Sequence, residues 1–106
     1  MTTVRLSRRA EQDIKEIRTF TLERWGEDQW FRYFVGLSAA MDRIADDPNC
    51  GRPRGLLLKG MRSLPHERHI FFFLPTRPGI SRAAILRLVH QRRNLGALAY
   101  YDDLGR

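Results

Sequence analysis

The sequence predicts an α+β domain in which a helical hairpin packs on one face of a mainly antiparallel sheet. Two long segments with apolar residues at helical spacing follow a short N-terminal strand, and three strand-like segments come after them. Because the helical segments are grouped together and the strands follow as a group, an α+β arrangement is favoured. The chain has 106 residues, about the length of one domain, so we expect residues 1–106 to form a single unit.

The first strand and the first helix are predicted at the N-terminus. Val4 and Leu6 alternate with polar residues, which is typical of a short edge strand. Ser7 follows as a predicted N-cap, because its side-chain oxygen can accept a hydrogen bond from the first turn of a helix. The helix shows an apolar stripe before Gly26 ends it, formed by Ala10, Ile14, Ile17 and Thr21.

A second helix is predicted from Glu27 to about Asp47, where Pro48 ends the pattern. Only Gly26 and its neighbours separate the two helical segments, so we expect them to form an antiparallel hairpin. The apolar face of this second helix is formed by Trp30, Tyr33, Phe34, Leu37, Met41, Ile44 and Ala45.

The second half of the chain predicts strands. Residues 48–60 are rich in proline and glycine and indicate an irregular connection. Strands are expected at Met61–Leu64, at Arg68–Leu74 and at residues 80–90, with a break at residues 65–67 of the length of a hairpin turn. Residues 95–104 are expected to add a short C-terminal helix.

The middle strand is apolar on both of its faces. Side chains alternate across a strand, so Ile70, Phe72 and Leu74 share one face while Phe71 and Phe73 share the other. This pattern predicts a central strand that is covered on both sides.

The charge of the chain is strongly asymmetric. The net charge is +7, and residues 1–53 hold nine basic and nine acidic side chains, whereas residues 54–106 hold ten basic and three acidic ones. A basic half of this kind suggests an anionic partner, either nucleic acid or an acidic protein surface. Direct binding of nucleic acid therefore stays open at this point.

Composition also argues against several classes of protein. Hydrophobic residues make up 42% and charged residues 29% of the chain, as in soluble globular proteins. Cys50 is the only cysteine and cannot form an internal disulfide, which favours a reducing, cytoplasmic location. No signal peptide or membrane span is predicted. No histidine pair has metal-ligand spacing with a third ligand, so we expect neither a metal nor a cofactor.

The chain resembles a ParE-type toxin of a bacterial type II toxin–antitoxin system, within the RelE/ParE superfamily of plasmid stabilisation proteins. The resemblance covers nearly the whole chain and rests on the order and spacing of short segments. These are Leu6-Ser7, residues 10–17, Trp25-Gly26, Gln29 and Tyr33, Leu37, Ile44-Ala45, Pro48, Gly51-Arg52, Arg62-Ser63, residues 68–71 and residues 85–92.

This resemblance implies a toxin that binds a ParD-like antitoxin and inhibits DNA gyrase without catalysing a reaction itself. RelE-like members of the superfamily instead cleave messenger RNA on the ribosome. The RelE-like pattern tends to have a lysine-rich connection before the second strand and a tyrosine soon after the last one. This chain has only Lys59 in that connection, and its C-terminal tyrosines come ten residues after His90, so the ParE function is favoured.

Residues for three functions can be nominated. The antitoxin-binding candidates lie off the two predicted core stripes of the hairpin, and they are Phe20, Leu22, Phe31 and Val35. An alternative is that the apolar connection at residues 56–58 covers some of them. The target-binding candidates combine cations and aromatic rings at the C-terminus, and they are Arg87, His90, Arg92, Arg93, Tyr100 and Tyr101. Here the alternative is a C-terminal helix that simply packs on the domain.

A ribonuclease would need cations and a proton donor, for which Arg62, Arg87 and His90 are the candidates. Alternation along the last strand places Arg87 with Ile85 and Val89 on one face, and His90 on the other, which argues against joint action on one phosphate. Arginine at positions 62 and 87 fits both branches of the superfamily. Each arginine is equally compatible with anchoring the sheet or the end of the chain.

Overall fold

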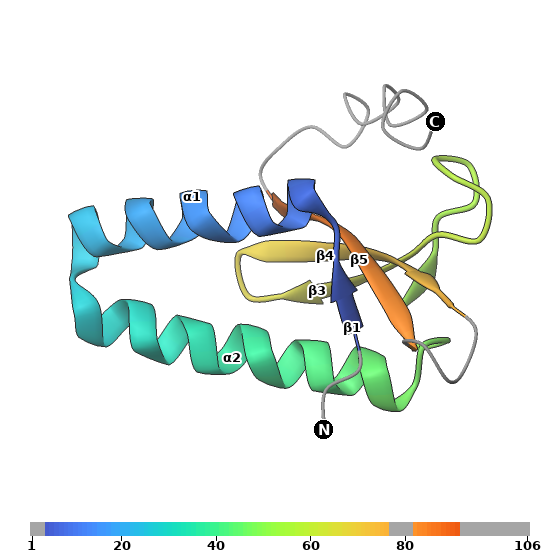
Figure 1. Ribbon diagram of the computed structural model, residues 1–106, viewed down its shortest axis with the longest axis horizontal. Helices are drawn as coiled ribbons and strands as arrows, with labels where there is room; N and C mark the ends of the chain where they lie inside the picture. Colours follow the sequence, from blue (N-terminus) through green and yellow to red (C-terminus); the bar gives the residue numbers. More distant parts are fainter. Residues whose placement is uncertain (1–3, 77–81, 92–106) are drawn as a thin grey trace.

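A computed structural model describes residues 4–76 and 82–91 of the chain, and residues 1–3, 77–81 and 92–106 lie outside the description. The predicted α+β class is confirmed (Figure 1). The predicted helix at residues 95–104 lies outside the described residues. The elements, in chain order, are β1 (Val4–Leu6), α1 (Arg8–Trp25), α2 (Glu27–Asp46), β2 (Arg52–Pro53), β3 (Arg62–His66), β4 (His69–Pro75) and β5 (Ala83–His90).

The described strands form one sheet in the order β1-β5-β4-β3-β2. The β2–β3, β3–β4 and β4–β5 pairs are antiparallel, and only β1 lies parallel to its neighbour β5. The sheet is therefore mainly antiparallel, as predicted. The first described strand, β1, pairs with the last one, β5. The two helices therefore belong to the connection between two strands that are neighbours in the sheet but distant in sequence.

Ser7 joins the first strand to the first helix. Its side-chain oxygen accepts a hydrogen bond from the backbone N–H of Ala10 at 3.0 Å, which confirms the predicted N-cap. The same hydroxyl donates to the carbonyl of Leu86 at 2.8 Å, and the backbone N–H of Ser7 donates to the carbonyl of Ile85 at 3.0 Å. The start of α1 is thereby fixed to β5.

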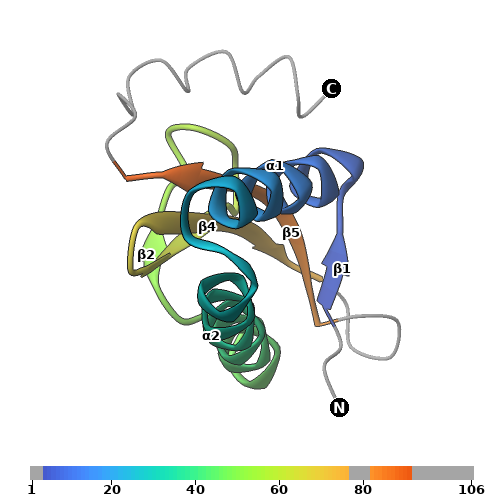
Figure 2. The same ribbon diagram turned by 90° about the vertical axis from the view of Figure 1, so that its left-hand side faces the viewer.

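The two helices meet at Gly26. This residue has a φ of 89°, a left-handed conformation that favours glycine, and its N–H donates to the carbonyls of Thr21 and Leu22 at 3.2 Å each. Acidic Glu27 and Asp28 follow in the first turn of α2, near the positive end of the helix dipole. Figure 2 looks along the hairpin and shows α1 and α2 side by side with the sheet behind them.

Both faces of the central strand are buried, as predicted. Phe71 and Phe73 lie in a core cluster with residues of both helices, including Ala10 and Ile44. Phe72 and Ile70 lie in a second cluster on the other face of the sheet, where the partly buried residues Leu57, Leu58, Leu74 and Leu86 pack against them. The first cluster holds the helical hairpin on the sheet.

The predicted turn at residues 65–67 is displaced. Strand β3 continues through Pro65 to His66, and the turn consists of Glu67 and Arg68, with a left-handed φ of 51° at Glu67. Proline is tolerated in β3 because the neighbouring strand β2 pairs only with Arg62 and Ser63, so β3 has a free outer edge at residue 65 among the described strands. The two-residue strand β2 was not predicted.

The closed end of the helical hairpin extends beyond the sheet (Figure 1). Apolar residues near Gly26 therefore have no strand to cover them. Among the described residues, no helix is long and apolar enough to cross a membrane.

Candidate functional site

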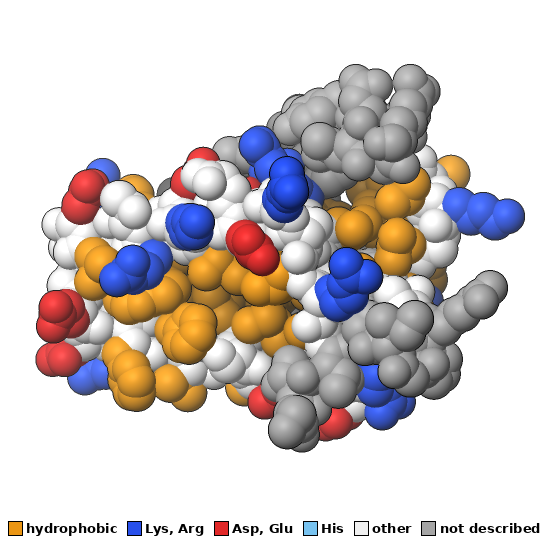
Figure 3. All heavy atoms as spheres, viewed as in Figure 1, with side chains coloured by type: hydrophobic (Ala, Val, Ile, Leu, Met, Phe, Trp, Pro, Cys, Tyr) orange, Lys and Arg blue, Asp and Glu red, His pale blue; other side chains and the backbone are white. Residues whose placement is uncertain are grey.

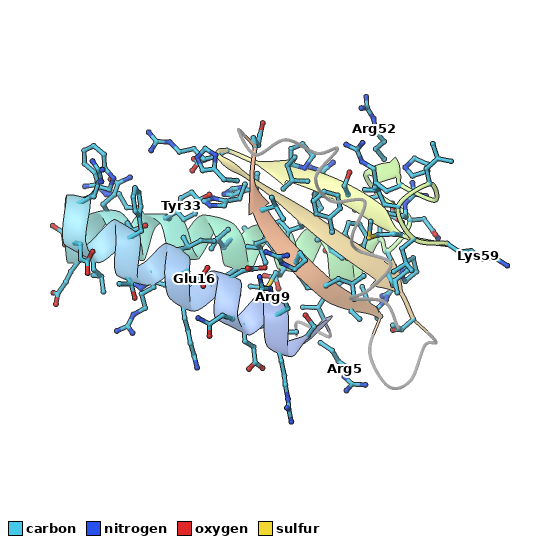
Figure 4. The ribbon with its side chains drawn as sticks, turned by 90° about the horizontal axis from the view of Figure 1, so that it is seen from above. Arg5, Arg9, Glu16, Tyr33, Arg52 and Lys59 are labelled. Atoms are coloured by element: carbon cyan, nitrogen blue, oxygen red, sulfur yellow. The ribbon has the colours of Figure 1, made fainter. Side chains whose placement is uncertain are left out.

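A cavity of about 660 Å³ lies between α1, the start of α2 and the ends of β4 and β5. In Figure 4, Arg9 and Glu16 lie along α1 and Tyr33 lies on α2, whereas Arg52 and Lys59 lie at the other end of the molecule. The volume is in the range of ligand-binding clefts. The lining residues are Arg9, Asp13, Glu16, Ile17, Phe20, Thr21, Trp25, Gln29, Tyr33, Glu67, Arg68, His69, Arg87, Leu88, Val89 and His90.

A row of three rings from three elements forms one wall of this cavity. The hydroxyl of Tyr33 in α2 is hydrogen-bonded to Nδ1 of His69 in β4 at 2.5 Å. His69 contacts the ring of His90 in β5 edge to face, with the ring centroids 5.3 Å apart. The registers of β4 and β5 explain this contact, because His69 and His90 are directly opposite each other.

Burial keeps both hydrogen-bonded groups of this row uncharged at neutral pH. Desolvation, reinforced by the charge of Glu67, raises the pKa of Tyr33 to about 12. Desolvation, reinforced by the neighbouring His90, lowers the pKa of His69 to about 4, although Asp13 opposes this shift. Arg68 and His66 also act to lower the pKa of His69. The hydrogen-bonded pair of Tyr33 and His69 is therefore neutral.

The lowered pKa of His69 predicts a loss of stability in mild acid. The ordinary histidine pKa is 6.5, so between pH 6.5 and 4 the unfolded chain binds a proton that the folded chain does not. We expect the free energy of unfolding to fall by about 1–2 kcal/mol across this window, after allowance for solvent screening of the part-exposed ring. Urea unfolding at a series of pH values measures this effect. If His69→Asn shows the same pH dependence as the wild type, His69 is not the group responsible.

Asp13 and Arg87 form a buried ion pair next to the row of rings. Nε of Arg87 donates to Oδ2 of Asp13 at 2.7 Å, and a second guanidinium nitrogen donates to Oδ1 at 3.1 Å. The backbone N–H of Leu88 also donates to Oδ2 at 3.0 Å. Arg87 is only 2% exposed. Two parallel hydrogen bonds between a guanidinium and a carboxylate tie β5 to α1.

Arg87 is therefore buried in the core beside Asp13, and its nomination as a target- or substrate-binding residue stays a prediction. The anchoring role, left open as the alternative for Arg87, is the one that these contacts describe. Sequence reasoning missed Asp13, although its position one residue before Ile14 placed it at the margin of the apolar stripe of α1.

The predicted alternation of β5 fails between Ile85 and Arg87, because the strand contains a β-bulge there. Phe73 pairs with Ile85 and Phe72 pairs with Arg87, so Leu86 is an additional residue in β5. After the bulge the faces are exchanged, and Leu88 joins Ile85 in the cluster under the helices. Within residues 87–90 the predicted alternation holds, since Arg87 pairs with Phe72 and His90 pairs with His69. Both residues nevertheless line the cavity, because the guanidinium of Arg87 reaches Asp13 of α1.

Arg62 does not join them. Its guanidinium donates to the carbonyls of Cys50 and Gly51 at 2.9 and 3.1 Å, so it holds the end of the α2–β2 connection against β3. Arg62 is opposite Phe73, four residues along β4 from His69, a separation of about 13 Å at the usual rise of a strand. The three ribonuclease candidates are thus not assembled around one point.

The apolar residues nominated for antitoxin binding lie on the overhanging hairpin. Phe31 is 67% exposed, Phe20 is 53% exposed and Val35 is 51% exposed, while Leu22 is partly buried. Figure 3 shows apolar side chains gathered over the two helices on the face in view, with basic and acidic side chains around them. Trp25 and Phe34 are further exposed aromatic residues of the hairpin, and Phe34 was expected on the apolar face of the second helix.

These four nominated residues do not share one side of the hairpin. Phe31 and Val35 are four residues apart on α2, so they lie on the same side of that helix. Phe20 and Leu22 are two residues apart on α1, which places them on roughly opposite sides. The side chain of Phe20 lines the cavity. The guanidinium of Arg24 lies 5.1 Å from the centre of the Phe20 ring. A ligand that touches all four must pass around the helix pair.

Arg92, Arg93, Tyr100 and Tyr101 lie outside the described residues. Within residues 4–76 and 82–91, no group of three or more potential ligands is arranged to hold a metal ion. Sequence reasoning treated Tyr33 as a core residue, and nothing in its spacing pointed to the contact with His69.

Comparison with known proteins identifies the family. A family model described as the ParE toxin of the type II toxin-antitoxin system parDE matches residues 4–95. The chain belongs to the ParE toxin family. It is 38% identical over 93 residues to Toxin ParE1 of Caulobacter vibrioides, covering 88% of this chain and 93% of that toxin. It is 34% identical over 90 residues to Toxin ParE1 of Mycobacterium tuberculosis, covering 85% and 90%.

The fold has a counterpart among solved structures. A chain of the chromosomal ParDE toxin-antitoxin system from P. aeruginosa matches with a TM-score of 0.68 at 18% identity, and the match covers 85% of this chain and 96% of that one. Family membership makes this protein the toxin of a type II toxin–antitoxin system, and that context implies an antitoxin partner.

Proposed function

We propose that this ParE-family toxin inhibits DNA gyrase without being an enzyme itself, and that a ParD-like antitoxin neutralises it by covering the helical hairpin. Family membership supports the antitoxin as a partner. The observation that carries the proposal at the level of residues is the exposed apolar surface of the overhanging hairpin, centred on Phe31 and Val35. Exposed apolar residues at helical spacing are the usual docking surface for an amphipathic segment of a partner.

The distribution of the apolar residues shapes the expected complex. Because Phe20 faces the cavity while Phe31 and Val35 lie on α2, a single straight helix does not reach all of them. The antitoxin segment is therefore expected to pass around the hairpin near Gly26. Such a segment would be disordered when free and would order on binding, which permits a large contact area with a small domain.

The arrangement of charged groups supports a non-enzymatic activity. A ribonuclease of the RelE type would need a cation and a proton donor at one phosphate. Here Arg87 is neutralised by Asp13 within the core, and Arg62 holds the backbone at residues 50–51, away from His90. Of the nominated cations, Arg92 and Arg93 remain as candidates for the target; they directly follow the last described residue in the sequence, with Tyr100 and Tyr101 beyond them. Direct contact between these cations and DNA in the gyrase complex stays open.

A supercoiling assay tests the proposal. We expect the purified toxin to inhibit gyrase at about stoichiometric concentrations and the antitoxin encoded beside it to restore supercoiling. Arg92→Ala together with Arg93→Ala is expected to weaken inhibition at least about tenfold while antitoxin affinity stays unchanged, since interfacial arginines commonly contribute more than 1 kcal/mol each.

A ribosome-based cleavage assay is the necessary control. Toxin that leaves supercoiling untouched in stoichiometric excess but cuts messenger RNA in a translating extract would overturn the gyrase proposal and favour the ribonuclease. Inhibition of gyrase that the double arginine variant retains in full would instead show that the C-terminal cations are not the target-binding residues.

A further inference from the structure

The end of strand β5 is held by two hydrogen bonds of Gln91. The backbone N–H of Gln91 donates to the carbonyl of Arg68 at 2.7 Å, and its side-chain amide donates to the carbonyl of Glu67. Gln91 is also the last described residue before Arg92 and Arg93. The described end of the chain at Gln91 is thereby tied to the β3–β4 turn.

That turn alone offers little rigidity. It consists of Glu67 and Arg68, both exposed, and it lies at the end of a two-strand hairpin where strand ends tend to fray. The row of rings supplies a second support from a different layer of the fold. His90 rests on His69, and His69 is hydrogen-bonded to Tyr33 of α2, whose own helix is fixed in the main core by Leu37 and Ile44.

We propose that Tyr33 and His69 are positioning residues that hold the end of β5, the strand that Arg92 and Arg93 follow in the sequence, and that inhibition of the target by those two arginines depends on this hold. The positioning role rests on the proposed function in so far as those two arginines bind the target. Its physical basis is that the row joins three elements through one hydrogen bond and one ring contact between partly buried side chains. Neutral partners in a sheltered site keep such a bond closed at physiological pH.

Removal of one hydroxyl group tests the role of Tyr33. Tyr33→Phe keeps the ring and its packing but removes the hydrogen bond to His69. We expect amide hydrogen exchange at Gln91 to become about tenfold faster, as loss of one hydrogen bond predicts, while exchange at Phe71 in the central strand stays unchanged. Gyrase inhibition is expected to weaken about fivefold or more, with antitoxin affinity within twofold of the wild type.

A matched control removes a hydroxyl group elsewhere. Ser63 is buried, and its hydroxyl accepts a hydrogen bond from Nε of Arg54 at 2.8 Å in another part of the sheet. Ser63→Ala therefore removes one buried hydrogen bond without touching the row. It is expected to leave exchange at Gln91 and gyrase inhibition unchanged, even if it lowers the melting temperature as much as Tyr33→Phe does.

A pair of variants at His69 separates positioning from general stability. An asparagine can place its carboxamide oxygen near the position of Nδ1 and accept the hydrogen bond from Tyr33, whereas a leucine of similar size cannot. His69→Leu is expected to reproduce the faster exchange at Gln91 and the weaker inhibition. His69→Asn is expected to restore both at least in part.

The outcomes distinguish this inference from the proposed function. Unchanged exchange at Gln91 in both Tyr33→Phe and His69→Leu would overturn the inference, whatever gyrase does. Faster exchange combined with full inhibition, in a toxin whose inhibition requires Arg92 and Arg93, would also overturn the positioning role while the proposed function stands. If the wild type does not inhibit gyrase, the proposed function is wrong. In that case unchanged amide exchange at Gln91 in Tyr33→Phe would show that the further inference is wrong too.

Discussion

Arg87→Met is expected to destabilise the fold by about 3–5 kcal/mol, the range measured when one partner of a buried ion pair is removed. The substitution leaves the carboxylate of Asp13 buried, with the N–H of Leu88 as its remaining hydrogen-bond donor among the described residues. A domain of this size has a total stability of roughly 5–15 kcal/mol, so the variant should be partly unfolded at physiological temperature. Urea titration followed by circular dichroism measures the loss.

The double variant Asp13→Leu with Arg87→Met is expected to recover much of this loss, because no uncompensated charge remains in the core. Recovery should be incomplete, since the N–H of Leu88 loses its acceptor. Arg62→Met is the comparison for a part-exposed arginine that contacts only backbone carbonyls, and a loss of about 1–2 kcal/mol is expected there. Wild-type stability of Arg87→Met would show that the pair does not anchor β5.

The largest functional effect is expected on the hairpin. Phe31→Ser combined with Val35→Ser should weaken antitoxin binding by about 10²–10³-fold, because two apolar anchors of an interface typically contribute about 2 kcal/mol each. Both side chains are more than half exposed, so the stability of the free toxin should change little. Isothermal titration calorimetry with the purified antitoxin gives the affinity. In cells, co-expressed antitoxin should no longer protect against the variant toxin.

Leu56 provides the matched control for this experiment. It is fully exposed on the β2–β3 connection, away from the helical hairpin, so Leu56→Ser removes a similar apolar side chain from a different surface. Antitoxin affinity should stay within about twofold of the wild type. An equal loss of affinity in Leu56→Ser, or none in the hairpin variant, would move the antitoxin away from Phe31 and Val35.

The order and type of the main elements were predictable because each depends on local signals. Ser7 caps α1 with its own side chain, and Gly26 separates the helices because only glycine readily adopts its backbone conformation. The apolar residues on both faces of residues 70–74 identified the central strand, because a strand that is buried on both faces needs apolar side chains at every position. The exposure of Phe31 and Val35 was predictable because both residues lie off the core stripe of α2.

The candidate site was much less predictable. The β-bulge at Leu86 reverses the faces of the later residues of β5 relative to Ile85, so that His90 lies on the side of the cavity. No local residue pattern predicted this bulge. The ion pair of Asp13 and Arg87 joins residues that are 74 positions apart in the sequence. The hydrogen bond between Tyr33 and His69 joins residues that are 36 positions apart. Simple alternation failed here because a single additional residue reverses every later side chain in a strand.

The sequence by itself determined the class of fold, the family and the apolar surface offered to a partner, because these follow from periodicity, capping and the order of segments along the chain. Only the tertiary structure decided which cations are free to act. Arg87 is withdrawn into the core by Asp13, and Arg62 is occupied by backbone carbonyls. The physical reason is that the cost of burying a charge depends on the partner that folding brings to it, and that partner is distant in sequence.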